Sequence, residues 1–320
     1  MEPDRQAVAL GRLIDRPVAA VAGGIPVIGA FRDGIAGDRI ERIAGILNGT
    51  CNYILTSMES AGATFDDALA KAQALGYAEA DPTDDVEGYD ARAKLAILCV
   101  VGLRVQVAPS DIACRPITAV DAVDFQYADQ LGCTIRQISQ AEIDPVDATR
   151  VIASVRPSLV PRRSMLARAE GSKNLIVARG HYGGDTVYSG SGAGGGPTSV
   201  AVVSDLAAIA ALEPERPVAT PPQPASRVDP EFLTAHYLRF VIKDRPGVLA
   251  ALATILASHD INIDAVLQHR VHSKEANAFV VTIEPCAPAT VATALAEISQ
   301  LDFHVAPTVD LPILSDGSEG

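Results

Sequence analysis

A proline-rich segment at residues 213–230 constrains the fold more than any other feature of the sequence. Six of its eighteen residues are proline, which lacks the backbone N–H that helix interiors and central strands need. We therefore predict a semi-rigid linker there. Because single hydrophobic cores stop growing near about 250–300 residues, a chain of 320 residues divided in this way is expected to form two domains.

The composition limits the partners of the protein. Hydrophobic residues make up 48% of the chain and aromatic residues 4%, with no Trp, so we expect an aliphatic core. Lys and Arg number 26 against 39 Asp and Glu, a net charge of −13. This charge opposes binding to nucleic acid and to anionic membranes, and we expect neither as a partner. No apolar run is long enough to span a bilayer, and the polar first residues differ from a secretion signal.

The cysteines indicate a reducing compartment. They are odd in number, widely spaced and without a CxxC pair, which argues against a disulfide framework and a zinc site. We expect a cytoplasmic protein whose cysteines mostly fill the core. A single reactive thiol is the alternative, with Cys51, in a polar turn, as its candidate. The five cysteines are Cys51, Cys99, Cys114, Cys133 and Cys286.

Before the linker, strand and helix patterns are mixed without regular alternation, which predicts an α+β domain. Residues 18–31 are apolar with a Gly-Gly break, typical of a strand, a turn and then a helix or strand. Thr50 is expected to cap the helix that follows the strand at residues 39–46. The remaining predicted elements are helices at 65–75, 89–101, 124–132 and 197–212, and strands at 151–159 and 173–180.

After the linker the pattern is compact and ordered. Its strands are predicted at residues 236–242, 261–268, 278–284 and 303–309. A helix at 246–258 should direct Leu249, Leu252, Ile255 and Leu256 inward, and a second helix is predicted at 289–299. The resulting order, βαββαβ, is the ferredoxin-like arrangement.

The segment from residue 75 to 98 concentrates chemically useful side chains. Pro82 interrupts any helix, so the acids up to Glu87 are expected on a loop. Asp90 and Lys94 are four residues apart and share one face of the next predicted helix. The acids of the segment are Glu79, Asp81, Asp84, Asp85, Glu87 and Asp90.

Lys94 is the candidate proton carrier. The apolar run that follows it partly desolvates the side chain and favours its neutral form, whereas the nearby carboxylates favour the ammonium. Such a lysine can exchange a proton with a substrate. Two alternatives stay open: a surface ion pair with Asp90, and a divalent metal bound by the carboxylates, although no calcium-loop spacing is present.

A glycine-rich stretch at residues 190–196, GSGAGGG, is the second candidate. Gly190, Gly192 and Gly195 satisfy GxGxxG after a predicted strand and before a predicted helix. The strand that would complete a dinucleotide-binding unit does not follow, so we expect no independent Rossmann fold here. Either the loop approaches a phosphate or substrate, or it is a tight structural turn. His181 is alone before the linker, which leaves little material for a Ser-His-Asp or histidine-metal site.

Four segments of the first half resemble the catalytic part of homoserine dehydrogenase. They are VAGGIPVI (21–28), RIERIAGILNGTCNYIL (39–55), LGYAEADPTDDVEGYDARAKLAIL (75–98) and YSGSGAGGGPTSVAVVSDL (188–206). The segment DRPGVLAALATILASHDINI (244–263) resembles an ACT regulatory domain. The resemblance implies an open mixed sheet packed with helices at residues 18–212 and a ferredoxin-like ACT domain at 231–314, on either side of the linker at 213–230. The tail at 315–320 is polar, and we expect it to be frayed.

The resemblance also implies an activity, the NAD(P)-dependent interconversion of L-homoserine and L-aspartate 4-semialdehyde. Lys94 would be the proton donor and acceptor at the substrate oxygen. Glu79 would bind the substrate amino group, Asp85 and Asp90 would orient substrate and lysine, and Tyr77 would line the pocket.

The cofactor is expected at two further motifs. Asn48, Gly49 and Thr50 would face the nicotinamide end, and the loop containing Gly192 and Gly194 would close over cofactor and substrate. Hydride transfer needs a hydride carrier and a proton partner, and the lysine would be that partner.

The sequence departs from the family pattern in two places. The family has a Rossmann domain before VAGGIP, whereas residues 1–17 contain no glycine fingerprint and are expected to be a remnant. We therefore expect little hydride transfer by these 320 residues alone. The family's monovalent-cation site would use the carbonyls of Val21, Gly23 and Ile25, but its Glu is replaced by Val18.

A non-catalytic function is the competing hypothesis. The chain would then be an amino-acid-sensing or dimerisation protein built around the ACT domain. An effector such as threonine would bind near Asp244, Gly247 and Asn262, at the loop before the first ACT helix. Under both hypotheses we expect a homo-oligomer.

Overall fold

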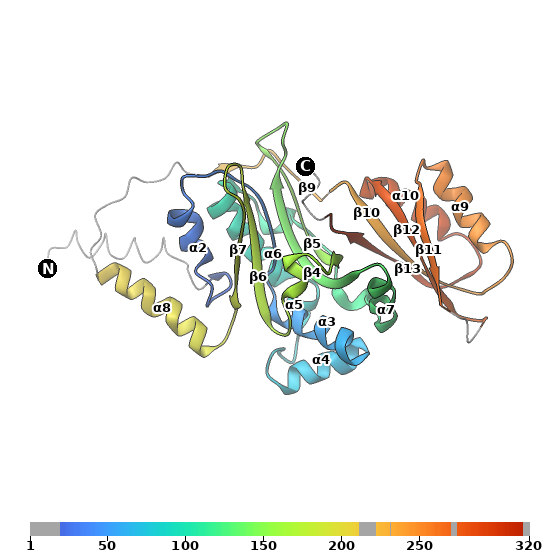
Figure 1. The fold of residues 1–320 in the computed structure, drawn as a ribbon, viewed down its shortest axis with the longest axis horizontal. Coiled ribbons are helices and arrows are strands. Elements are labelled where there is room, and N and C mark those ends of the chain that lie inside the picture. The colour runs from blue at the N-terminus through green and yellow to red at the C-terminus, as the bar shows by residue number, and fades with distance from the viewer. Residues whose placement is uncertain (1–19, 211–221, 231, 270–273, 316–320) are drawn as a thin grey trace.

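The computed structural model describes residues 20–210, 222–230, 232–269 and 274–315 (Figure 1). The helices are α2 (Val27–Gly29), α3 (Gly49–Ala61), α4 (Phe65–Ala74), α5 (Thr83–Val86), α6 (Tyr89–Leu98), α7 (Ala122–Gln130), α8 (Gly195–Ala210), α9 (Val248–Ser258) and α10 (Pro288–Ile298). Shorter helical turns are η2 (Ala30–Gly34), η3 (Cys99–Leu103), η4 (Pro109–Asp111), η5 (Ile117–Ala119) and η6 (Met165–Arg168).

The strands form one large sheet and one small one. They are β1 (Ile40–Ile46), β2 (Val105–Gln106), β3 (Ala113–Cys114), β4 (Cys133–Ile143), β5 (Arg150–Pro161), β6 (Lys173–Gly180), β7 (Gly184–Ser191), β8 (Gln223–Pro224), β9 (Arg227–Asp229), β10 (Thr234–Ile242), β11 (Ile263–Gln268), β12 (Asn277–Cys286) and β13 (His304–Ile313). The large sheet has the order β11-β12-β10-β13-β5-β4-β1-β6-β7, with β3 and β9 also paired to β5, and β2 pairs with β8.

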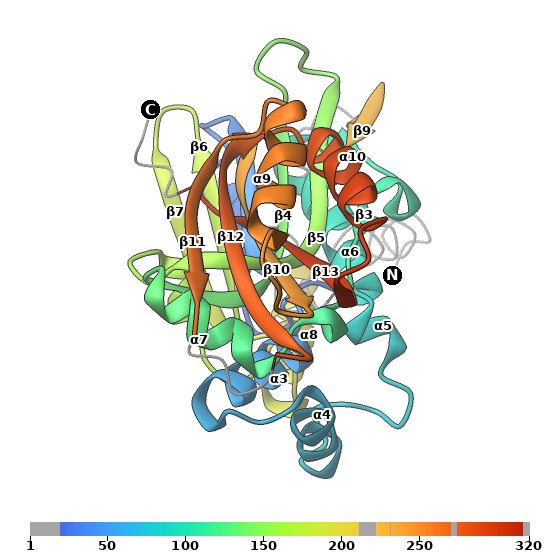
Figure 2. The same ribbon diagram turned by 90° about the vertical axis from the view of Figure 1, so that its right-hand side faces the viewer.

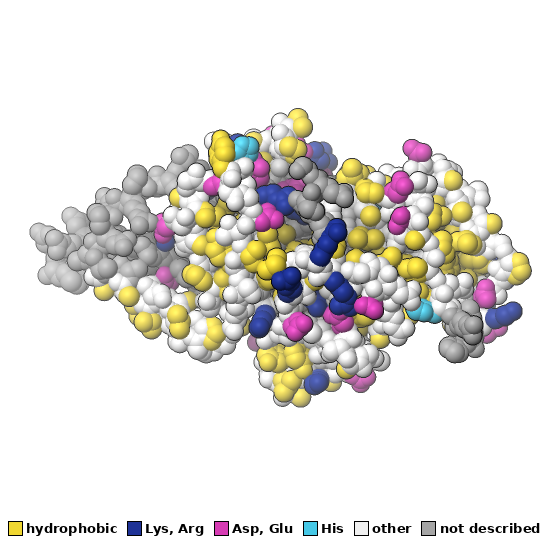
Figure 3. Space-filling view, in the orientation of Figure 1, with side chains coloured by type: hydrophobic (Ala, Val, Ile, Leu, Met, Phe, Trp, Pro, Cys, Tyr) yellow, Lys and Arg dark blue, Asp and Glu magenta, His cyan; other side chains and the backbone are white. Residues whose placement is uncertain are grey.

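The part of the chain before the linker, residues 20–210, is called the first half here. It is the α+β domain that the sequence predicts, with an open sheet and helices. One face of the sheet packs on α6 and its continuation η3, through aliphatic side chains such as Ile43, Ala141 and Ile176. Among the described residues, the opposite face is covered by η6 and the end of β13, where Ala44 and Leu166 are buried. In the space-filling view this second face exposes basic and apolar side chains near the centre of the molecule (Figure 3).

Strand β4 was missed by the sequence analysis. It forms a long antiparallel hairpin with β5, in register from Cys133 opposite Pro161 to Ile143 opposite Val151. Its first nine residues are buried, although many of them are polar. The alternation of polar and apolar residues that identifies a half-exposed strand is therefore absent.

Several local expectations were wrong in detail. The cap of α3 is Asn48, whose Oδ1 accepts from the Cys51 N–H at 2.8 Å, and Thr50 lies inside the first turn. The acids Asp84 and Asp85 lie on the one-turn helix α5 rather than on a loop, because Pro82 begins that helix instead of ending one. Residues 20–25 form turns and not a strand, with Ala22 at φ 51°.

The second half has the βαββαβ order that the sequence predicts. Strands β10, β11, β12 and β13 are antiparallel neighbours, and helices α9 and α10 cover one face of them (Figure 2). Leu252, Ile255 and Leu256 point into this core, but Leu249 is 46% exposed, contrary to expectation. The other face packs against helix α7 of the first half, where Tyr127 and Tyr237 share one apolar cluster.

The end of the linker is held more firmly than predicted. Strand β9 pairs in parallel with β5, from Arg227 opposite Arg150 to Asp229 opposite Ile152. Arg150 also forms an ion pair with Asp229 at 2.9 Å. Residues 225–229, which contain no proline, thus include a short edge strand. Proline-rich segments are found at sheet edges because proline cannot donate a hydrogen bond to a strand on each side. Residues 211–221 and 1–19 lie outside the described residues.

No helix of the described residues is both long and apolar enough to cross a membrane. All five cysteines are free. Cys51 does not lie in a polar turn but is buried in the first turn of α3.

Candidate active site

Lys94 lies at the centre of the candidate site. It extends from α6, and its Nζ donates to Asp90 Oδ2 at 2.6 Å and to the Leu47 carbonyl at 3.2 Å. The side chain is 23% exposed. An ammonium has three N–H donors, and these two acceptors are the ones present among the described residues. One N–H is therefore available to a bound molecule.

Asn48 connects the lysine pair to a second carboxylate. Its Nδ2 donates to Asp85 Oδ1 at 2.6 Å and to Asp90 Oδ2 at 2.9 Å. Asn48 is buried, so its position is fixed from both sides: its own Oδ1 caps α3 and its amide holds the two acids. The i,i+4 spacing seen in the sequence is thus one part of a network that spans α3, α5 and α6.

The electrostatics of this network favour protonation of Asp85. Partial burial raises the pKa of the Asp85 carboxyl, and the nearby charge of Asp90 acts in the same direction, against the hydrogen bond from Asn48. Burial, reinforced by Asp85 and Asp90, also raises the pKa of the Cys51 thiol well above its usual value. A buried thiol of this kind stays protonated, which removes the support for Cys51 as a reactive nucleophile.

Of the other residues expected around the substrate, Tyr77 contacts residues of α3, whereas the Glu79 side chain does not contact the network. Thr50 Oγ1 donates to the Tyr77 carbonyl at 2.6 Å, and the Tyr77 ring packs on Tyr53 with centroids 4.7 Å apart. Tyr77 therefore lies at the edge of the network. The Glu79 side chain is exposed and no described residue bonds it, although Gln73 donates to its backbone carbonyl. Its role in substrate binding stays a prediction.

The glycine-rich stretch at 190–196 connects a strand to a helix, as expected: its first two residues end β7 and its last two begin α8. A Cβ at Gly24 would lie 2.7 Å from the Ser191 carbonyl oxygen, so the Gly23-Gly24 turn packs directly on this stretch. A Cβ at Gly192 would collide with the side-chain amide of Asn174 on β6. Gly194 has φ +114°, a conformation that favours glycine. The close backbone approach explains why glycines are needed here.

Two members of the site were not identified from the sequence. The Leu47 carbonyl accepts from Lys94 and from Asn174 Nδ2, the latter at 3.0 Å. A backbone acceptor has no sequence signal. Asn174 directly precedes the apolar run 175–178 of its strand, but it also follows Lys173, so the sequence does not distinguish it from an exposed strand end.

Comparisons with known proteins agree with this arrangement. Residues 26–207 match the model of the homoserine dehydrogenase family, and residues 236–303 match the ACT domain. The chain belongs to the homoserine dehydrogenase family. A homoserine dehydrogenase of Mycobacterium tuberculosis is 43% identical over 263 residues, which cover 79% of this chain and 59% of that protein. One from Synechocystis is 39% identical, covering 89% of this chain and 68% of the relative.

A solved structure extends the likeness to three dimensions. The crystal structure of a homoserine dehydrogenase from Thiobacillus denitrificans has a TM-score of 0.83 and 37% identity, over 93% of this chain and 69% of that one. The chain thus spans 59% of the length of the Mycobacterium relative, 68% of the Synechocystis relative and 69% of the Thiobacillus structure.

The sequence analysis considered two ion sites, a divalent metal bound by carboxylates and a monovalent cation bound by carbonyls. In the described part of the chain no group of three or more His, Cys, Asp or Glu side chains is placed to bind a metal ion. Of the three carbonyls expected around a monovalent cation, that of Ile25 already accepts from the Val27 N–H at 2.8 Å. Val21 and Gly23 lie in the same turn, and Val18 lies outside the described residues.

The ACT half of this homoserine dehydrogenase family chain contains a cavity of about 200 Å³. Asp244, Gly247 and the start of α9 form one side, and Gln268 and Phe279 form the other. Gly247 caps α9 with φ +93°, where another residue would be strained. Asn262 does not line this cavity; its carbonyl accepts from the Glu284 N–H instead.

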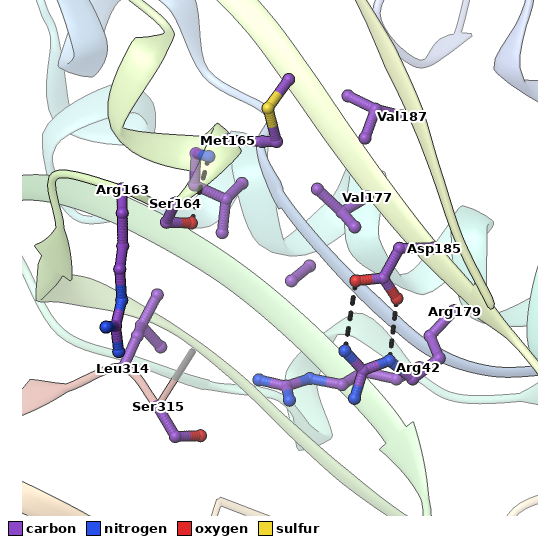
Figure 4. Close-up of a pocket in the computed structure, with 12 residues that line it drawn as sticks. Arg42, Arg163, Ser164, Met165, Val177, Arg179, Asp185, Val187, Leu314 and Ser315 are labelled. Atoms are coloured by element: carbon purple, nitrogen blue, oxygen red, sulfur yellow. Dashed lines mark hydrogen bonds and ion pairs between the residues drawn. The ribbon is translucent and has the colours of Figure 1, made fainter. Parts of the chain in front are cut away.

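A larger cavity, about 420 Å³, lies on the open face of the sheet (Figure 4). Arg179 and Asp185 form an ion pair at its rim, 2.8 Å between Nε and Oδ1. Its floor includes Ala44 and Val177. These side chains alternate with those that pack on α6, so the cavity and Lys94 are on opposite faces of the sheet.

Proposed function

We propose that this chain supplies the substrate-binding and proton-transfer machinery for the NAD(P)-dependent interconversion of L-homoserine and L-aspartate 4-semialdehyde. The observation that supports this most directly is the Lys94 ammonium. It is fixed by Asp90 and the Leu47 carbonyl, and it retains one free donor position beside Asp85.

Lys94 would act on the oxygen at C4 of the substrate. When homoserine is oxidised, the C4 hydrogen leaves as a hydride with its electron pair, and the hydroxyl proton passes to neutral Lys94. In the reverse direction the ammonium returns that proton to the aldehyde oxygen. A positioned proton carrier of this kind typically accounts for about 10²–10⁴ of a rate enhancement.

The acids would hold the amino-acid end of the substrate. Asp85 and Asp90 are near enough to Lys94 to orient both the lysine and a substrate ammonium. Glu79 is exposed at the rim, where it could bind the amino group without first breaking another side-chain contact. Tyr77 would cover the same side through its packing on Tyr53.

NAD(P) would accept or donate the hydride. The residues that would hold its nicotinamide end come together in the fold, because Gly49 and Gly192 both pack closely on Asn174. Asn48 and Thr50 flank Gly49 at the start of α3, and Gly194 continues the glycine stretch. We also propose that a monovalent cation binds to the backbone carbonyls of Val21, Gly23 and Ile25, without a carboxylate ligand.

The ACT half would sense an amino acid. The cavity beside Asp244 and Gly247 offers a carboxylate for the effector ammonium and the N-terminus of α9 for its carboxylate. Threonine, a product of the pathway that homoserine enters, is the effector we propose. Asn262 is left out of this binding site.

The open face of the sheet exposes apolar side chains. Met165 and Val187 are 42% and 37% exposed beside the open face of the sheet. We propose that a second copy of the chain covers this face, which light scattering tests directly. Five free cysteines are consistent with a reducing cytoplasm.

The test uses two forms of the protein. The first is the 320-residue chain. The second, the fused protein, is the same chain joined behind the N-terminal part of the Mycobacterium relative, where we expect that protein to have its nucleotide-binding domain. We expect the chain alone to bind L-homoserine in calorimetry, and the fused protein to reduce NADP⁺ with homoserine. Absence of both binding and turnover contradicts the proposal.

A further inference from the structure

Asn174 is a buried polar residue that the proposed mechanism does not use. It lies on β6, is 1% exposed, and donates from Nδ2 to the Leu47 carbonyl at 3.0 Å. The same carbonyl oxygen accepts from Lys94 Nζ at 3.2 Å. A single backbone oxygen therefore connects the amide of Asn174 to the ammonium of Lys94.

The Leu47 carbonyl lies just beyond the paired part of the sheet. β1 ends at Ile46, which is the last residue opposite β6, and α3 is capped by Asn48. Leu47 is the junction between strand and helix. Among the described residues the donors to its oxygen are Asn174 Nδ2 and Lys94 Nζ, and we infer that the more deeply buried Asn174 amide sets the direction of that oxygen.

The rest of the Asn174 side chain supports the same interpretation. Its Oδ1 is buried and has no hydrogen-bond partner among the described residues. Burying an amide oxygen in this way is unfavourable, and a leucine of similar shape would avoid it. What leucine lacks is the N–H that reaches the Leu47 carbonyl.

We propose that Asn174 is a positioning residue for Lys94, acting through the Leu47 carbonyl. With Leu47 and Asp90 both fixed, two of the three ammonium hydrogens have set directions, and the third is directed to the substrate oxygen. This inference rests on the proposed function for its catalytic consequence, but the contact chain itself does not depend on it.

The substitution that tests this is Asn174→Leu, with Asn52→Leu as a matched control. Asn52 is also a buried asparagine whose Oδ1 has no partner among the described residues. Its Nδ2 donates to the Ala169 and Gly171 carbonyls, at 2.9 Å each, and to the Lys173 carbonyl at 3.3 Å. Both substitutions remove an amide that holds backbone carbonyls. Only one of those carbonyls binds Lys94, so a purely structural role predicts the same outcome for both.

The first measurement does not require turnover. The 320-residue chain is acetylated with limiting acetic anhydride, and labelling of Lys94 is quantified by mass spectrometry relative to the exposed Lys71. We expect labelling of Lys94 to rise severalfold in Asn174→Leu and to stay at the wild-type level in Asn52→Leu. Equal labelling of Lys94 in all three proteins overturns the inference.

The second measurement is kinetic and uses the fused protein. Misplacing a reacting group by about 1 Å can cost on the order of 100-fold, so we expect kcat to fall about 10- to 100-fold in Asn174→Leu with KM for homoserine nearly unchanged. Asn52→Leu should keep the kcat of the folded fraction. A kcat equal to that of Asn52→Leu overturns the inference.

The two measurements separate the possible failures. If the fused protein is inactive but labelling of Lys94 still responds to Asn174→Leu, the proposed function fails and the positioning contact stands. If the leucine variant does not fold, Asn174→Ala and Asn52→Ala give the same comparison, because each also removes the amide donor.

Discussion

Asp124 of helix α7 and Arg239 of strand β10 form a buried ion pair, with Oδ1 2.6 Å from Nε. The same carboxylate oxygen accepts from Tyr237 Oη at 2.7 Å, and Arg239 also donates to the Ala119 carbonyl at 3.1 Å. Asp124 belongs to the first half of the chain and Arg239 and Tyr237 to the ACT half. The interface between the two halves, called the joint below, therefore contains a buried ion pair and its hydrogen bonds in addition to apolar contacts.

Removing Asp124 should weaken this joint strongly. Asp124→Ala leaves the Arg239 guanidinium buried without its carboxylate, which costs about 3–5 kcal/mol. Urea unfolding should show this loss, with the ACT half unfolding separately from the first half. Asp185→Ala is the control, because Asp185 is 45% exposed in its pair with Arg179 and exposed pairs contribute under about 1 kcal/mol. Similar losses in the two variants would contradict the importance of the joint.

Replacement of Lys94 should abolish proton transfer without unfolding the chain. In the fused protein, Lys94→Ala should lower kcat by about 10²–10⁴. Lys94→Arg keeps the charge and can keep a contact with Asp90, but a guanidinium does not give up its proton. We therefore expect Lys94→Arg to be folded, able to bind homoserine and nearly inactive. A kcat close to wild type in either variant would remove Lys94 from its proposed role.

The sequence predicted those parts of the molecule whose signals are local. The strand β6, the helix α4 and the pairing of Asp90 with Lys94 all follow from spacing within one element. Strand β4 was missed because both of its faces are buried, so its side chains do not alternate in polarity.

Contacts between distant segments could not be predicted in the same way. Asn48 lies between Asp85 and Asp90 because α3, α5 and α6 converge, and no spacing within one element encodes that. The second part of the linker pairs with β5 since that strand has an unoccupied edge there, a property of the sheet and not of the linker.

Asp85→Asn should stabilise the protein at neutral pH. The folded pKa of Asp85 is raised by burial and by Asp90 above its ordinary value of 3.8. Its contribution to stability is therefore complete below 3.8 and is lost as the pH rises through the folded pKa. At pH 7 the asparagine removes the repulsion between the Asp85 and Asp90 carboxylates. For such a partly exposed pair we expect the free energy of unfolding to rise by roughly 0.5 kcal/mol.

The measurement is the unfolding temperature of both proteins between about pH 4 and 8. We expect the advantage of Asp85→Asn to shrink toward pH 4, because protonation of the wild-type carboxyl increases as the pH falls. Asp84→Asn, on the exposed side of α5, is the matched control. An advantage that is constant across this range would show that the charge of Asp85 is not its cause.

L-threonine should bind in the ACT cavity through Asp244. The cavity lies between Asp244 and Gly247 on one side and Gln268 on the other, and Asp244 is its one carboxylate among the described lining residues. Because a hydrogen bond to a charged group contributes about 1.5–3 kcal/mol, Asp244→Ala should weaken threonine binding about 10- to 100-fold in calorimetry. Asn262→Ala should bind threonine as the wild type does, since Asn262 lies outside the cavity. The proposed effector site would be wrong if threonine released no heat with the wild-type chain, or if Asn262→Ala lost binding while Asp244→Ala kept it.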